Sequence, residues 1–202
     1  LTESYDHELH EALEEGRIGD FISNTVNKAK SLVARGKLQG LILFNKLKDT
    51  VYNFKSEHPT IFKAAIIILG AAAAYLAIDF LLNPEAQAVV TDMPMETQEL
   101  VVGTLQEFGS VAQEEGATDT YVAIQKSISA FQRAHQTAAE MEFSEFANSL
   151  KDASEAAHQA LYQGMEVARD VSRSAVEAGE GSEEAATLDK LVSTGKMILQ
   201  SQ

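Results

Sequence analysis

The chain has 202 residues, no cysteine, no tryptophan, three prolines and a formal net charge of −14. A chain without cysteine has no disulfide framework, no thiolate nucleophile and no zinc site built on cysteine. Its acidic balance argues against nucleic acid as a partner, because binding a phosphate backbone requires a basic surface.

The charge is distributed unevenly and divides the chain into parts that must be interpreted separately. Residues 1–16 hold six acids and no base, whereas residues 17–63 hold nine bases and three acids, a net charge of +6. Residues 84–202 hold 20 acids and seven bases, a net charge of −13. We therefore predict three units. They are basic amphipathic helices behind a short acidic helix (1–58), a hydrophobic helix (59–84) and an acidic helical bundle or stalk (85–202).

Apolar periodicity predicts three helices in the first unit. A short acidic helix covers residues 3–15, a second helix covers 18–34 and ends before Gly36, and a third covers 38–54. The second and third are basic and amphipathic, a pattern that suits an anionic membrane surface or a helical partner. The alternative is that these two helices pack on each other as a helical hairpin.

Residues 61–82 form one hydrophobic stretch, which Asn83 and Pro84 bring to an end. As a helix it would reach roughly 33 Å, against a hydrocarbon core of about 30 Å. A basic flank precedes it and an acidic section follows, so the positive-inside rule predicts a single membrane pass with the N-terminal side cytoplasmic. The alternative is the central helix of a soluble bundle, buried on all sides. The basic flank consists of Lys46, Lys48, Lys55 and Lys63.

Two features inside the hydrophobic helix bear on its partners. Gly70, Ala73, Ala74 and Ala77 form a small-residue face, which would let another helix approach closely and favours helix–helix packing in an oligomer. Asp79 is an acid near the end of the apolar run, where its side chain can reach headgroup water. The alternative for Asp79 is an intramembrane acid that pairs across an oligomer or marks an ion path.

The chain stays helical after Pro84. We expect one helix that opens near Pro94 and closes at Gly116, a second that starts at Thr118 or Asp119, and a third that starts at Ser144. A linker follows at residues 179–182, and then a last helix. Together these predict an all-α fold whose C-terminal unit is a helical bundle or a coiled-coil stalk.

Histidine and acidic residues make two patterns that resemble metal-binding motifs. His7 and His10 lie three residues apart, one short of the zincin spacing, beside Glu11. Glu155 and His158 supply one Glu-x-x-His motif, but a di-iron site needs a second copy and two further glutamates. No nucleotide-binding or hydrolase motif is present. We therefore predict no catalytic residue, no cofactor and no metal.

The first residues, Leu1-Thr2-Glu3-Ser4, resemble the end of the capsid-targeting leader of internal and structural head proteins of T4-like bacteriophages. In that family the prohead protease cuts after a Leu/Ile-x-Glu tripeptide. The resemblance implies cleavage after Glu3 and a helical, non-enzymatic protein inside a virion. The basic Met-Lys start of such leaders is absent. A chain that begins at Leu1 is consistent with a missing leader.

These patterns lead to one functional hypothesis and two alternatives. The first is a non-enzymatic, single-span helical structural or assembly protein of a larger complex, located in a membrane or a virion, whose partners are other protein subunits or further copies of itself. The second is a soluble all-α interaction module with a buried hydrophobic helix. The third is an ion- or proton-handling membrane subunit that uses Asp79.

Overall fold

Helices account for all the regular secondary structure of the described residues, which are 2–15, 17–177 and 182–200 of the computed structural model. The fold is therefore all-α, as the composition predicted. In chain order the elements are α1 (Thr2–Glu15), α2 (Ile18–Ala34), α3 (Gln39–Tyr52), α4 (Pro59–Leu82), the 3-10 turn η1 (Pro84–Ala86), α5 (Gln87–Thr91), α6 (Met95–Glu114), α7 (Thr118–Glu140), α8 (Phe143–Ser149), α9 (Lys151–Glu177) and α10 (Ser182–Leu199).

Local sequence sets the ends of these helices. Pro59 occupies the first turn of α4, where a missing N–H costs nothing. Gly36 and Gly116 follow α2 and α6 with φ of 72° and 74°, the left-handed conformation that glycine adopts without strain. Asn83 follows α4, and its side-chain amide donates to the carbonyl oxygens of Val33 and Ala34 at the end of α2. The ends of α2 and α4 are thus joined.

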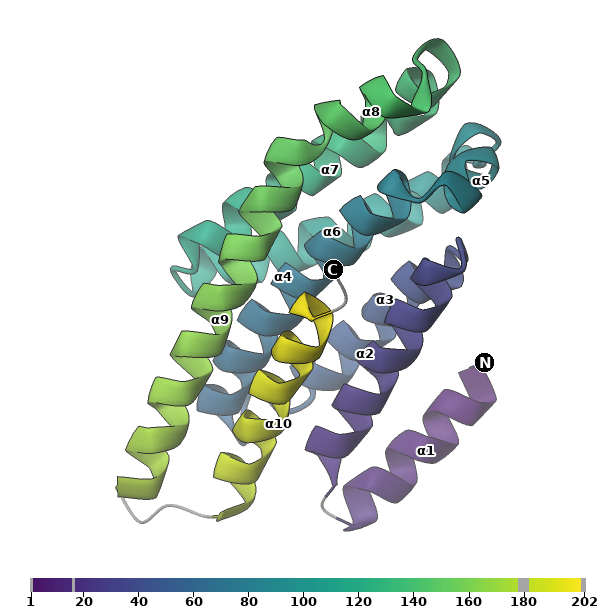
Figure 1. The fold of residues 1–202 in the computed structure, drawn as a ribbon. Helices are drawn as coiled ribbons and strands as arrows, with labels where there is room; N and C mark the ends of the chain where they lie inside the picture. Colours follow the sequence, from purple (N-terminus) through teal and green to yellow (C-terminus); the bar gives the residue numbers. More distant parts are fainter. Residues whose placement is uncertain (1, 16, 178–181, 201–202) are drawn as a thin grey trace.

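The hydrophobic helix α4 lies at the centre of the bundle. It packs against α9, α7, α10, α3, α6 and α2, with α9 and α7 covering most of its length (Figure 1). Eighteen of its 24 residues are buried. A helix that is apolar on every side has to be covered on every side, and here the chain's own helices provide that cover.

The N-terminal helices form a hairpin on one side of α4. α2 packs on α3 and α10, and α3 also contacts α4 and α6. The contact within the hairpin is closest at Gly40, where a Cβ atom would lie 2.5 Å from the carbonyl oxygen of Ala29. α1 lies on the outside of α2, at the edge of the bundle (Figure 1). The hairpin, an alternative at the level of sequence, is thus the arrangement found.

One hydrophobic core runs through all three predicted units. It includes Tyr5 and Phe44 from the first, Phe80 from the second, and Phe131 and Ile198 from the third. The helices after α4 pack around it as part of this core. The helices of all three predicted units thus share one core, and a separate acidic bundle or coiled-coil stalk in the C-terminal unit remains a prediction.

The chain departs from the expected elements after α4. A 3-10 turn and the short helix α5 precede α6, and the helix expected from Ser144 is divided at Leu150 into α8 and α9. In the predicted linker, residues 179–181 lie outside the described residues, and Ser182 already begins α10.

Candidate functional site

The small-residue face of α4 lies against α7. A Cβ atom added at Gly70 would lie 3.2 Å from Ile124 and 3.3 Å from Thr120, both on α7. Ala73, Ala74 and Ala77 are at most 3% exposed. Small residues let two helix backbones approach closely, and in this chain α7 occupies the approach. Self-association through the face remains a prediction from sequence.

Polar and glycine contacts fasten α4 to its two main neighbours. The Ser127 hydroxyl of α7, fully buried, lies 3.2 Å from the carbonyl oxygen of Ala74 and 3.0 Å from that of Ala123. From α9, a Cβ atom at Gly164 would lie 3.1 Å from Ile67 and 3.3 Å from Ile68. Two helices that also contact each other therefore approach α4 at close range.

Asp79 lies near the C-terminal end of α4 and is partly buried. Burial raises the pKa of the Asp79 carboxyl above its usual value, and the nearby positive charge of Lys30 opposes the shift. The Lys30 ammonium also donates to the carbonyl oxygen of Met197 in α10, at 2.9 Å. Asp79 thus faces a cation of its own chain, where α2, α4 and α10 meet.

The structure distributes the four lysines of the predicted basic flank over different parts of the fold. Lys46 lies over the ring of Tyr5 and Lys55 over the ring of Phe62, each 5.3 Å from the centroid. Lys63 is exposed beside the turn between α6 and α7. Lys48 is buried in contacts with α6. Of the four, Lys48 therefore lies in the interior, and a basic surface formed by the other three remains a prediction.

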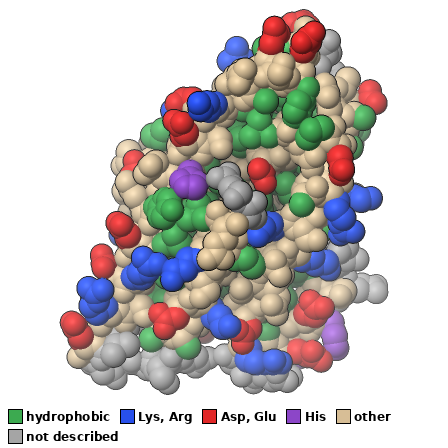
Figure 2. All heavy atoms as spheres, in the orientation of Figure 1, with side chains coloured by type: hydrophobic (Ala, Val, Ile, Leu, Met, Phe, Trp, Pro, Cys, Tyr) green, Lys and Arg blue, Asp and Glu red, His purple; other side chains and the backbone are tan. Residues whose placement is uncertain are grey.

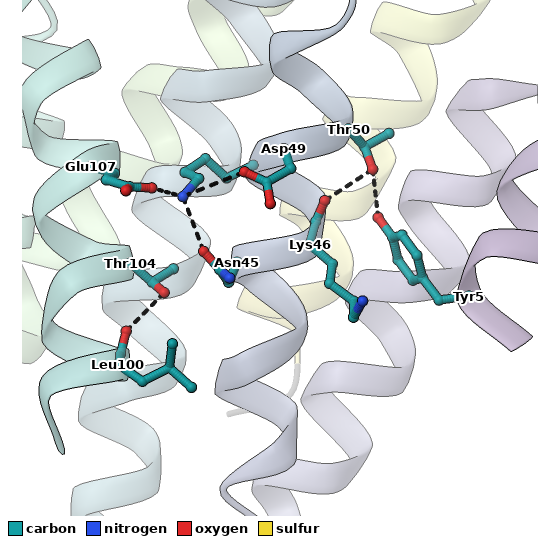
Figure 3. A network of polar contacts seen from close by, with 9 residues as sticks. Tyr5, Asn45, Lys46, Asp49, Thr50, Leu100, Thr104 and Glu107 are labelled. Carbon is teal, nitrogen blue, oxygen red and sulfur yellow. Dashed lines mark hydrogen bonds and ion pairs between the residues drawn. The ribbon is translucent and has the colours of Figure 1, made fainter. Parts of the chain in front are cut away.

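Lys48 is the centre of a polar network between α3 and α6. Its ammonium forms an ion pair with Glu107, lies 3.0 Å from the side-chain oxygen of Asn45 and lies 3.6 Å from Asp49 (Figure 3). The Lys48 side chain is 7% exposed, whereas that of Glu107 is 56% exposed. A buried cation is therefore neutralised from the solvent side, which fixes α3 against α6.

The acidic helix α1 is attached through an aromatic residue. Tyr5 is buried, its ring contacts the Phe21 ring edge-on at 5.1 Å, and its hydroxyl lies 2.7 Å from that of Thr50 (Figure 3). The Thr50 hydroxyl also lies 2.9 Å from the carbonyl oxygen of Lys46, so it links α1 to the backbone of α3. Burial raises the pKa of Tyr5 to about 12; the Thr50 hydrogen bond opposes this, and Asp49 and Asp6 add to it.

The histidines noted in the sequence lie apart from one another. His7 is exposed and pairs with Glu11 at 3.3 Å along one face of α1. His158 of α9 lies between aromatic rings, 6.4 Å from that of Tyr75 and 5.1 Å from that of Tyr162. Within the described part of the chain, no three His, Asp or Glu side chains come together as metal ligands could.

α4 also satisfies the length and composition of a membrane span. Within residues 2–15, 17–177 and 182–200 it is the one helix that does so, with a mean hydropathy of 2.3 over its most apolar window. In the fold, 89% of that window is buried inside the protein. The core helix of a soluble protein satisfies the same criteria of length and composition. Those criteria therefore do not distinguish the two environments, and the structural observation is that the chain's own helices bury α4.

Large apolar side chains are also exposed on the outer helices. Val89 of α5 and Met95 and Leu100 of α6 are 38%, 67% and 43% exposed. Figure 2 shows hydrophobic side chains gathered on the upper part of the face drawn, where α5, α6 and α8 lie. Single exposed apolar residues are normal on a protein surface, and it is contiguous apolar patches that mark contact sites for other proteins.

Comparison with known proteins identifies no matching family model, no similar curated protein and no similar solved structure.

Proposed function

We propose that this chain is a non-enzymatic helical structural or assembly protein that folds around α4 and binds other protein subunits through its outer helices. The observation that carries the proposal is the enclosure of α4, whose 18 buried residues contact helices of the same chain. A helix covered in this way serves as the core of a fold. The outer surface of the bundle is then available for partners.

The contacts of α7 and α9 with α4 support this role. The buried Ser127 hydroxyl of α7 faces the α4 backbone, and Gly164 of α9 leaves room for α4. A buried hydroxyl requires a polar partner, and Ser127 finds carbonyl oxygens in α7 and α4. The small-residue face of α4 then serves packing within one chain.

The exposed apolar residues of α5 and α6 support the binding of subunits. Val89, Met95 and Leu100 leave apolar area in water that association would bury. The net charge of −14 favours a partner surface with basic groups around an apolar centre.

Fractionation and light scattering test this proposal together. We expect the full chain to remain in the aqueous fraction without detergent and to form oligomers, or to capture its native subunits. Replacing Met95 and Leu100 by glutamate should weaken association at least tenfold. Val122→Glu is the matched control, since Val122 is 40% exposed on α7. Recovery only with detergent, or association unchanged by the double substitution, would contradict the proposal.

A second candidate, the single-span anchor, is favoured by the dimensions of α4. Its 24 residues extend about 36 Å, enough to cross a hydrocarbon core of about 30 Å. Crossing would require α9, α7 and α10 to move away from α4. Flotation with anionic lipid vesicles tests this, and protease protection of the C-terminal helices would establish the orientation. An ion-handling role would in addition require that Asp79→Asn abolish flux.

A virion location is a third proposal, and it rests on the resemblance of the first four residues to phage head proteins. Identification of proteins that co-purify with the chain from its native source tests it directly. Capsid proteins among them would support the assignment, and their absence from intact preparations would oppose it.

A further inference from the structure

A cavity of about 250 Å³ lies where α1 ends and α2, α4 and α10 begin. Figure 1 shows the end of α1 and the starts of α2 and α10 at the lower end of the bundle. Its inner wall is formed by apolar side chains that are at most 2% exposed. These are Ile22 of α2, Val51 of α3, and Phe62 and Ala65 of α4. Five helices and the turn between α3 and α4 contribute to the wall, so the cavity belongs to the tertiary fold.

The middle of α4, in contrast to this cavity, is closely packed. At Gly70 and Gly164 the neighbouring helices leave only 3.1–3.3 Å for an added methyl group. Protein interiors contain few voids larger than a water molecule, and an apolar cavity of about 150 Å³ is enough to bind benzene. The space at the end of α4 is therefore large enough for a ligand with a single aromatic ring and a short substituent.

The mouth of the cavity is more polar than its inner wall. Leu13 of α1 is 47% exposed there, and Glu57 and His58 lie beside it in the turn between α3 and α4. Lys55, in the same turn, has its ammonium over the ring of Phe62. The Glu57 carboxylate thus lines the mouth, whereas Ile22, Val51, Phe62 and Ala65 of the inner wall carry neither a charge nor a polar side-chain atom. A charge buried without a partner is disfavoured.

We propose that this cavity binds a small uncharged amphiphile, an aromatic or short aliphatic alcohol, with its apolar body against Phe62 and Ala65. The hydroxyl lies at the mouth, where it donates to the Glu57 carboxylate. Apolar pockets with a few polar groups at one end are the usual form of small-molecule sites. This inference is independent of the assembly role, because the α5–α6 residues proposed for subunit contacts do not line the cavity.

The test is an NMR titration of the full chain with benzyl alcohol, followed through backbone amides. We expect saturable shifts at Ile22 and Ala65, and binding of benzoate and of benzylamine at least tenfold weaker. Ala65→Phe should fill the inner wall and abolish the saturable shifts. Ile61→Trp, at the half-buried mouth, should weaken binding at least tenfold and keeps the test valid if the first variant fails to fold.

Ala153→Leu is the matched control, because it fills a separate hollow between α7, α8 and α9. It should leave benzyl alcohol binding unchanged. The proposal is overturned by linear, non-saturable shifts in the native chain, by undiminished binding in folded Ala65→Phe or Ile61→Trp, or by equal affinity for benzoate. Loss of binding in Ala153→Leu alone would also overturn it, since the ligand would then occupy the other hollow.

Discussion

Removing Glu107 should destabilise the protein more than removing the buried lysine that it neutralises. In Glu107→Ala the Lys48 ammonium, 7% exposed, keeps Asn45 at 3.0 Å and Asp49 at 3.6 Å but loses its ion pair with α6. In Lys48→Met a chain of similar length fills the same space without a charge, and Glu107, 56% exposed, stays hydrated. The structure therefore predicts an asymmetry between the two partners.

The burial of each partner sets the size of the effect. Breaking a fully buried ion pair costs about 3–5 kcal/mol, and an exposed pair contributes about 0.2–1 kcal/mol. Because one partner of this pair is exposed and two weaker partners remain, Glu107→Ala should cost about 1–2 kcal/mol. Lys48→Met should change stability by less than about 1 kcal/mol. The double variant should match Lys48→Met alone, since no buried charge is left.

Urea unfolding followed by circular dichroism measures these differences. A loss of about 1.5 kcal/mol lowers the midpoint by roughly 0.5–1 M urea. Asp152→Ala is the matched control: it removes an exposed pair with Lys126, whose side chains are 79% and 39% exposed, and should cost less than about 0.5 kcal/mol. Equal destabilisation by Lys48→Met and Glu107→Ala, or a cost of Asp152→Ala as large as either, would contradict the predicted asymmetry.

Three further predictions concern α3, α1 and α4. Gly40→Ala should destabilise the protein by about 2 kcal/mol or more, because its Cβ would lie 2.5 Å from a backbone oxygen. Gly103→Ala is the control in the same urea assay. It should stabilise the protein by about 0.5–1 kcal/mol, because a Cβ atom there would have nothing within 4 Å. With the pKa of Tyr5 raised to about 12, stability should fall between about pH 10 and 12 as the unfolded chain ionises first; an ultraviolet titration of Tyr5→Phe should lack this late transition. Asp79→Asn should stabilise the protein at pH 7, because burial raises the pKa of Asp79 and so disfavours its ionised form in the folded state. The gain in stability should vanish as the pH falls below the usual carboxyl range, where Asp79 is protonated in both states. A gain that stays constant with pH would contradict this prediction.

The helices themselves were predictable from sequence because the residues that start and end them are close by in the chain. Periodicity and Gly36 predict a helix over 18–34, and α2 has those bounds. Asn83 and Pro84 predict the end of α4, which stops at Leu82. The division at Leu150 was missed, since neither glycine nor proline marks it and apolar residues continue on both sides.

The burial of Lys48 could have been inferred from spacing, although its partner could not. Lys48 lies four residues after Phe44 and three before Val51, so it belongs to the same face of α3 as these buried residues. Grouping it with the other lysines by charge concealed that position. Glu107 lies 59 positions further along the chain, and only the tertiary fold brings it to α3.

The same limit explains the cavity at the end of α4. Its walls come from segments as distant as Ala12 and Thr187, and each lining residue continues an ordinary apolar pattern. A void results from the way that five helix ends meet, and no single stretch of sequence encodes it. The site proposed for a small ligand is therefore a property of packing alone.

The environment of α4 is determined by its neighbours more than by α4 itself. Lipid and a protein core make the same demand on a helix, namely that every side be apolar, so residues 61–82 alone satisfy both. What differs is in the covering helices: α7 carries a buried serine toward Ala74, and α9 carries a glycine against Ile67. If α7 and α9 were detached from α4 and faced water, neither the serine nor the glycine would make these contacts. The complementarity of α7 and α9 to α4 thus supports our proposal that α4 is the core of the fold.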